Sequence, residues 1–461
     1  MYGGALFPKF PVFYIRSAII IAFWAGVSLG AHNAFVLAFG FNVDNTFSIF
    51  SQVHGYIQLM GWVGIFIMGI SIHFLPRLFN FQKKYKLYIK PIYILMIIGL
   101  LLRYVFHSML PYTQETLWYD IVVSIIILST IFVLMSIMLY VRLLLSILLS
   151  KKSDERFPKK DIKYFVLMSV FGWVIYGSGA VFLSSKMFFT KQIFFDYNSN
   201  ILLTDLFINF TIIPICFGIG SRVIPLFLRL KINDFDIKKF SLIYLSVLTA
   251  LFSSKLYLMI NPLNNIHVIE ISYFGLSIIK NLLFVWFVYK LNIFSRKRAV
   301  VNQFLIERNL LKSTLKYGEF GTFIGIVKSA FFWLALAIFF EILSNFGLIF
   351  NIPFDIREDG IRHLWLAGFT SLLIVGLGIK MVPPMTGNKI ALNQKVILSL
   401  MLIMNFSVFS RALFLIIPRS ILNIFPSGGT IAMHLFGTSG IFFLFGLAIF
   451  YYLLKPALVS K

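Results

Sequence analysis

The stretch "HGYIQLMGWVGIFIMGISIHFLPRL", residues 54–78, is almost entirely apolar, yet it starts with one histidine and carries a second near its end. A run of about 20 apolar residues is long enough to cross roughly 30 Å of hydrocarbon as an α-helix. The whole chain of 461 residues is 59% hydrophobic, whereas soluble globular domains have about 45–50% apolar residues. The stretch therefore predicts a membrane-spanning helix in an integral membrane protein.

Segments of the same kind recur along the whole chain, which predicts an all-α polytopic membrane protein with twelve transmembrane helices in a single membrane domain, residues 1–461. The twelve segments lie at 12–31, 50–76, 88–109, 119–149, 163–188, 201–228, 240–260, 267–294, 320–349, 361–385, 396–418 and 427–454. The single cysteine, Cys216, excludes a disulfide within the chain and cysteine-based metal or iron–sulfur sites.

The net charge of +24 is concentrated in alternate loops. Lysine and arginine gather in the loops after the even-numbered segments, at 76–90, 151–163, 229–239, 295–316 and the tail after Lys455. The opposite loops, at 32–47, 111–120 and 261–267, are poor in both. By the positive-inside rule, both termini are cytoplasmic in a multi-pass plasma-membrane protein. This alternation also argues against nucleic acid as the partner of the positive charge.

One motif occurs three times, at the inner ends of the second, sixth and tenth segments. The copies "GISIHFLP" (69–76), "GIGSRVIP" (218–225) and "GLGIKMVP" (376–383) all fit G-x-[GS]-x-[HRK]-x-x-P. Glycines allow close approach of helices in lipid, and the basic residue and proline suit the point where a helix leaves the bilayer. The spacing predicts three pseudo-repeated four-helix units, approximately 1–160, 161–316 and 317–461.

Six of the seven histidines fall toward the outer side of the predicted topology, and His73 falls at the inner end. We interpret His73 and three of the outer histidines as residues of the membrane interface; those three are His32, His107 and His267. The remaining three lie in the first turns of even-numbered segments, and they are His54, His363 and His434. A histidine inside a membrane segment indicates a functional site, and imidazole nitrogen suits iron, copper and zinc.

Twelve helices in three four-helix units, with motifs on the second, sixth and tenth, resemble the core subunit of heme–copper oxidases and the NnrS family of heme membrane proteins. The resemblance implies a b-type heme whose axial ligands are His54 and His363. It also implies a role in electron transfer or in nitric oxide and respiratory metabolism, with a quinol or an outward-side redox protein as partner.

The sequence departs from these families at several positions. A second histidine two residues before His363 would ligate a high-spin heme, but Ile361 stands there. Residues 201–260, where copper ligands would lie, contain no histidine, so an oxygen-reducing centre is not expected and copper has little support. The His-x-His pair of NnrS proteins reads His54-Gly55-Tyr56 here, so the second ligand is lost or is replaced by Tyr56, a candidate cofactor-binding residue. His434 matches the histidine in the last helix of those proteins.

Heme propionates need cationic partners, and the planar fork of arginine binds carboxylate in bidentate fashion. Three arginines are predicted at the level of the outer histidines: Arg103, Arg411 and Arg419. Arg411 is the leading candidate, with an ion pair to Glu341 or Glu270 as the alternative.

The remaining charges inside the predicted segments are Asp205, Lys255, Glu270, Lys280 and Glu341. They are expected to pair with one another, although a proton route stays open as the alternative. Two other functions also remain open: a cofactor-free structural subunit of a larger membrane redox complex, and a transporter, since twelve helices with pseudo-repeats and buried charges describe many carriers.

Overall fold

The structure is a computed structural model, and it describes residues 10–79, 81, 86–150, 160–228, 230, 235–261, 267–295, 322–352, 354–387, 393–422, 424 and 427–459. The predicted basic loops at 151–163 and 295–316 lie mostly outside these residues, as does the predicted repeat boundary at 316.

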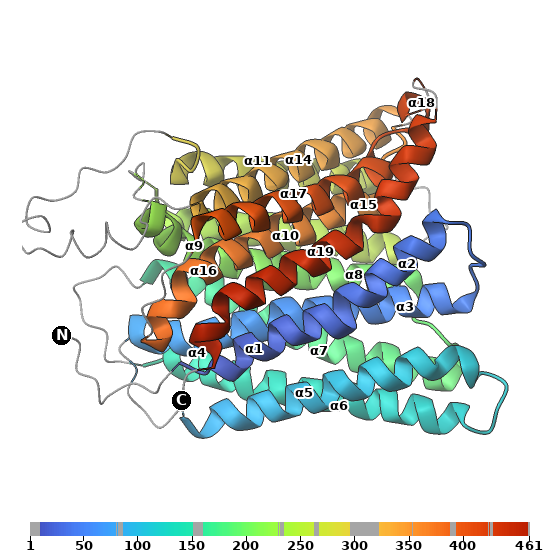
Figure 1. Ribbon diagram of the computed structural model, residues 1–461, viewed down its shortest axis with the longest axis horizontal. Helices are drawn as coiled ribbons and strands as arrows, with labels where there is room; N and C mark the ends of the chain where they lie inside the picture. Colours follow the sequence, from blue (N-terminus) through green and yellow to red (C-terminus); the bar gives the residue numbers. More distant parts are fainter. Residues whose placement is uncertain are drawn as a thin grey trace, which may run out of the picture. The chain divides into compact units, whose positions relative to one another are not determined.

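Every element of the described residues is a helix. In chain order the helices are α1 (Val12–Ile21), η1 (Ala22–Val27), α2 (Ser28–Ala38), α3 (Asn45–Tyr56), η2 (Ile57–Gly64), α4 (Ile65–Leu78), α5 (Lys86–Met109), η3 (Leu110–Tyr112), α6 (Tyr119–Leu148), α7 (Lys160–Thr190), α8 (Tyr197–Phe207), η4 (Ile208–Ile212), α9 (Ile213–Leu228), α10 (Ile237–Ile260), α11 (His267–Leu291), α14 (Phe323–Phe350), α15 (Glu358–His363), η5 (Leu364–Ser371), α16 (Leu372–Thr386), α17 (Gln394–Ile416), α18 (Arg419–Leu422) and α19 (Gly428–Leu458) (Figure 1). The η elements are π-helical, except for η3, which is a single 3-10 turn.

These helices join into twelve spans that are long and apolar enough to cross a membrane, which confirms the predicted all-α polytopic fold class. The first span continues to Ala38, beyond its predicted end at residue 31. Its polar residue Asn33 does not end the helix, since Asn33 Nδ2 donates to the carbonyl of Phe47 (3.1 Å) and to Ser51 Oγ (2.8 Å). The second span therefore satisfies a polar group that the sequence pattern assigned to a loop.

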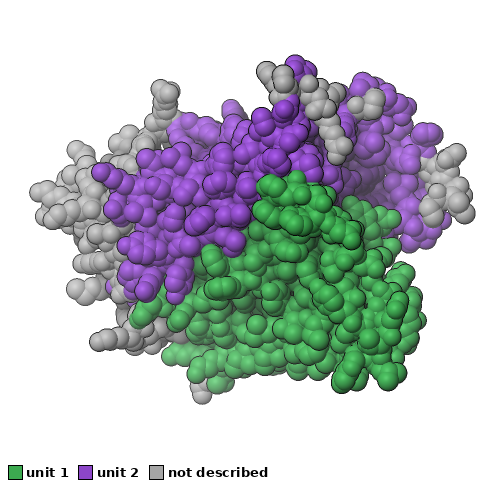
Figure 2. Space-filling view, turned by 45° about the vertical axis from the view of Figure 1, so that its right-hand side comes forward, with its two compact units in different colours: residues 1–218, 458–461 green, residues 219–457 purple. Residues whose placement is uncertain are grey.

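The chain divides into two compact units, coloured separately in Figure 2. Unit 1 comprises Met1–Gly218 and Leu458–Lys461, and unit 2 comprises Ile219–Ala457. The division falls inside α9, directly after the first glycine of the second motif copy.

Unit 1 is held together by hydrogen bonds between helices as well as by packing. Helices α5 and α6 lie side by side (Figure 1), and Ser136 Oγ on α6 donates to the carbonyl of Ile92 on α5 at 2.6 Å. Tyr14 on α1 donates its hydroxyl to the carbonyl of Ile89 at 2.8 Å. Because lipid gives no hydrophobic drive for association of spans, such bonds and close packing stabilise the bundle.

The glycines of the three motif copies allow close approach of helices, as the motif predicts. A Cβ added at Gly69 would lie 2.7 Å from Tyr14 on α1, and one at Gly218 would lie 3.1 Å from Phe165 on α7. At Gly376 it would lie 2.8 Å from Val327 on α14. Each motif glycine thus packs against the span that precedes its own, namely the first, fifth and ninth.

The three motif-bearing spans share two further features. They are the most enclosed of the twelve, with 94%, 61% and 78% of the most apolar window buried in the second, sixth and tenth spans respectively. Each also contains a π-helical segment, namely η2, η4 or η5, that ends shortly before the motif glycine. A π-helical segment shifts the side chains that precede it around the helix and is frequent at functional sites.

Aspartates cap the first turns of two of these three spans, the second and the sixth. Asp44 caps α3 by accepting from Thr46, and Asp196 caps α8 by accepting from the backbone N–H (2.9 Å) and hydroxyl (2.7 Å) of Ser199. These hydrogen bonds lower the pKa of both carboxyl groups below the usual value, with the side-chain bond as the largest cause in each. Both caps therefore stay charged at neutral pH, where they stabilise the positive ends of their helices.

Candidate functional site

His54 lies in α3, just before the π-helical segment η2, with its ring held against the first span. Its Nδ1 is 2.8 Å from the carbonyl oxygen of Gly26, so Nδ1 carries the proton and donates it. A Cβ added at Gly30 would lie 2.4 Å from Cε1 of the same ring, so only glycine leaves room for the imidazole there. Donation from Nδ1 places the ring's lone pair on Nε2, the nitrogen that can bind a metal.

His363 has the same protonation pattern in unit 2. It is the last residue of α15 and directly precedes η5, and its Nδ1 donates to the carbonyl of Asp359 at 2.6 Å. Arg362 stabilises the same helical turn through two ion pairs, from Nη2 to Glu358 Oε2 at 2.8 Å and from Nη1 to Asp359 Oδ1 at 3.0 Å. The lone pair of His363 therefore also lies on Nε2.

The two histidines do not occupy equivalent positions relative to the motif. His363 precedes its motif glycine, Gly376, by thirteen residues, as Asp205 precedes Gly218. In the first copy the position thirteen residues before the glycine is Tyr56, and His54 lies two residues further from the glycine on the same helix. Tyr56, Asp205 and His363 are thus the three equivalent residues.

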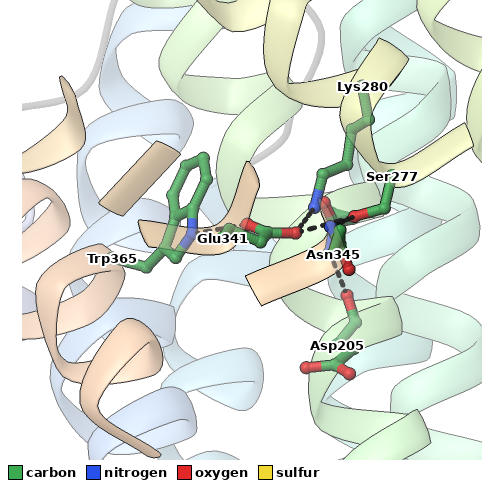
Figure 3. Close-up of polar contacts among 7 residues, drawn as sticks. Asp205, Ser277, Lys280, Glu341, Asn345 and Trp365 are labelled. Carbon is green, nitrogen blue, oxygen red and sulfur yellow. Dashed lines mark hydrogen bonds and ion pairs between the residues drawn. The ribbon is translucent and has the colours of Figure 1, made fainter. Parts of the chain in front are cut away.

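A polar network surrounds Glu341 in unit 2 and joins α11, α14 and η5 (Figure 3). Glu341 Oε1 accepts from Lys280 Nζ at 2.7 Å and from Ser277 Oγ at 3.0 Å. Its Oε2 accepts from Trp365 Nε1 at 3.2 Å, and Asn345 Nδ2 donates to Ser277 Oγ at 3.0 Å. The predicted pairing of membrane charges is confirmed for Lys280 and Glu341. Trp365, a member of this network, follows His363 by two residues in the sequence.

The alternative role of Arg411, an ion pair with Glu341 or Glu270, is not what the structure shows. Glu341 is bound by the three donors described above, and Glu270 lies 3.6 Å from His267 at an exposed position. The guanidinium of Arg411, on α17, lies 4.7 Å from the ring centre of Phe436 on α19. The prediction that Arg411 meets a propionate is unaffected by these contacts.

A second polar cluster lies in unit 1 around Arg103, on α5. Arg103 and His107 are both fully buried, with 0% of each side chain exposed. The guanidinium carbon of Arg103 lies 4.9 Å from the ring centre of Tyr56 and 4.6 Å from that of Phe195, and Arg103 Nη1 donates to Ser184 Oγ at 3.1 Å. Two predicted site residues, Arg103 and Tyr56, are thus in direct contact.

His107 is buried, contrary to its interpretation as a residue of the membrane interface. We interpreted it as interfacial because it lies near the end of an apolar segment, but the structure encloses it completely, with its ring 5.5 Å from that of Phe195. The available signal was the four-residue spacing between Arg103 and His107, which puts both on one face of a helix. His73, also interpreted as interfacial, is 8% exposed and packs its ring 5.0 Å from Phe10.

The other predicted site residues lie on less enclosed parts of the structure. His434 is exposed on α19, and the predicted interfacial residues His32 and His267 are exposed as well. The side chain of Arg419, at the start of α18, lies outside the described residues. Among the side chains that the structure describes, no group of three or more His, Cys, Asp or Glu residues is placed to hold a metal ion.

In a comparison with known proteins, no protein-family model and no curated protein matches the chain.

Proposed function

We propose that this protein is a b-type heme protein of the plasma membrane, similar to the NnrS and heme–copper oxidase families, in which His54 and His363 are axial heme ligands. In this proposal it carries electrons, or takes part in nitric oxide or respiratory metabolism, and it exchanges electrons with a quinol or an outward-side redox protein. The alternation of loop charge supports cytoplasmic termini and an outward location of both histidines.

The observation that carries the proposal is the contact made by Nδ1 of both histidines. Metal-ligating histidines almost always donate their other ring N–H to a carboxylate or a backbone carbonyl, which fixes the tautomer and the ring orientation. His54 and His363 each donate Nδ1–H to a carbonyl, of Gly26 and of Asp359 respectively. Both residues therefore fit an iron ligand that binds through Nε2.

A bound heme would supply one-electron redox chemistry, and the chain's own residues would hold and orient it. Gly30 leaves the space in which the ring of His54 lies, and the ion pairs of Arg362 fix the turn that ends at His363. That the two histidines clamp the same heme stays a prediction from the resemblance, as do copper binding and the ligand role of His434.

Heme content is the test of this proposal. The full-length chain, expressed with an adequate heme supply and purified in detergent, is expected to contain heme b in a fixed molar ratio, measured as the pyridine hemochrome. Gel filtration and thermal unfolding of the same sample show whether it is folded. A folded chain that contains no heme would contradict the proposal and favour the structural subunit or the transporter.

A further inference from the structure

Arg103 is a buried cation whose hydrogen-bonding capacity is mostly unused. Its side chain is fully buried, and only Nη1 has a partner, Ser184 Oγ at 3.1 Å. Within the part of the chain that the structure describes, the Nε and Nη2 groups have no hydrogen-bond partner. In a guanidinium these two N–H groups lie along one edge and point the same way, which is the arrangement that binds two oxygens of one planar anion.

The described residues around Arg103 provide no counter-charge. Its guanidinium lies over the rings of Tyr56 and Phe195, at 4.9 Å and 4.6 Å from their centres, and Tyr176 is stacked on Tyr56 with ring centres 6.1 Å apart. Aromatic faces attract a cation, but a buried ion without an ionic partner still has a large desolvation cost. An anion that binds from outside these side chains would therefore stabilise the buried charge of Arg103.

Further unpartnered polar atoms accompany the free edge of Arg103. The hydroxyl of Tyr56 is buried without a partner among the residues that the structure describes, and so are both ring nitrogens of His107, one turn along α5 from Arg103. Buried polar groups in proteins are almost always paired, so three neighbouring side chains with five such nitrogen and oxygen atoms indicate a binding site for a polar ligand. Four of these five atoms can donate to a small oxyanion, namely Arg103 Nε and Nη2, the Tyr56 hydroxyl and one ring nitrogen of His107, because a neutral imidazole carries a single N–H.

We propose that Arg103, with Tyr56 and His107, binds a planar carboxylate-type oxyanion through the Nε and Nη2 edge of its guanidinium. Two sources share this chemistry: a propionate of the bound cofactor and a free small oxyanion such as formate or nitrite. The first source rests on the proposed function. The second does not, because the site lies entirely within unit 1 and needs no heme.

The test compares wild type with Arg103→Lys, which keeps the charge and removes the fork, and with Tyr56→Phe, which removes only the hydroxyl. Arg142→Lys is the matched control, since Arg142 also lies over a tyrosine ring, that of Tyr88 at 5.7 Å, but is exposed. Each protein is dialysed extensively, and then two quantities are measured. The first is the thermal unfolding midpoint as a function of added sodium formate or sodium nitrite, with sodium chloride at equal ionic strength as the control. The second is the heme content of each protein, together with the midpoint potential of the heme.

For a free oxyanion, formate or nitrite raises the unfolding midpoint of wild type and of Arg142→Lys saturably, whereas chloride does not. The rise disappears in Arg103→Lys, and the apparent affinity falls about tenfold in Tyr56→Phe, the usual effect of losing one hydrogen bond to a charged group. For a propionate, wild type does not respond to formate, and Arg103→Lys and Tyr56→Phe lose heme or shift its potential while Arg142→Lys does not.

If wild type contains no heme, the proposed function fails and the formate and nitrite titrations alone decide this inference. If Arg103→Lys does not fold, Tyr56→Phe decides it. The inference is overturned if wild type shows neither a saturable response to an oxyanion nor a change of heme content or potential on substitution. That outcome would mean that water satisfies the unpartnered atoms.

Discussion

Replacing Glu341 by glutamine is expected to lower the free energy of unfolding by about 3–5 kcal/mol, the largest single-residue effect we predict. The substitution leaves the ammonium group of Lys280, which is 6% exposed, without its carboxylate at 2.7 Å. Removing one partner of a buried pair strands the other charge in a medium that solvates it poorly. Thermal or denaturant unfolding of the detergent-purified protein measures the loss.

Two further variants separate the stranded charge from other causes. Lys280→Met combined with Glu341→Gln should recover most of the lost stability, because it removes both charges at once. Glu358→Gln breaks an exposed ion pair with Arg362, which keeps its second carboxylate on Asp359, so a change below about 1 kcal/mol is expected. Equal losses of unfolding free energy in Glu341→Gln and Glu358→Gln would show that the buried Lys280–Glu341 pair contributes no more to stability than the exposed pair.

Gly30→Ala is expected to destabilise the protein by about 1–3 kcal/mol and to displace the ring of His54. The new Cβ would lie 2.4 Å from Cε1 of that ring, much closer than van der Waals contact, and the ring is tied to Gly26 by its Nδ1. Alanine is the better helix former by about 1 kcal/mol, so the overlap must exceed that gain for a net loss to appear. The unfolding midpoint measures the sum of the two effects.

Gly55→Ala is the matched control for Gly30→Ala. Gly55 follows His54 in the same helix, and a Cβ added there would meet nothing within 4 Å. The control is expected to be neutral or to gain up to about 1 kcal/mol from helix propensity. If Gly30→Ala were tolerated as well as Gly55→Ala, the close packing of the His54 ring against Gly30 of the first span would be contradicted.

The twelve spans could be predicted from sequence because each is a long apolar run, and length and hydropathy are local properties. The role of Gly69, Gly218 and Gly376 in close helix approach was also predictable, since the repeated motif marks the same packing position three times. The end of the first span was not, because Asn33 is satisfied by partners in the next span, and no local pattern encodes such contacts.

Features of the candidate site that depend on tertiary contacts were harder to predict. Both Arg103 and His107 lie in an ordinary apolar segment, and only packing of other helices encloses them fully. The π-helical segments beside His54 and His363 could not be predicted from hydropathy, since both stretches are mostly apolar, like the α-helical turns around them. The choice of Glu341 as the partner of Lys280, among several membrane carboxylates, likewise required the three-dimensional structure.

The claim that His54 and His363 are axial heme ligands is tested most directly by the electron paramagnetic resonance spectrum of the oxidised, purified protein. Wild type should give a low-spin ferric signal typical of two imidazole ligands. His54→Ala and His363→Ala should each convert this signal to a high-spin one or remove the heme, whereas His32→Ala, at an exposed histidine, should leave it unchanged. A low-spin signal that persists in both His54→Ala and His363→Ala would contradict the assignment of these ligands.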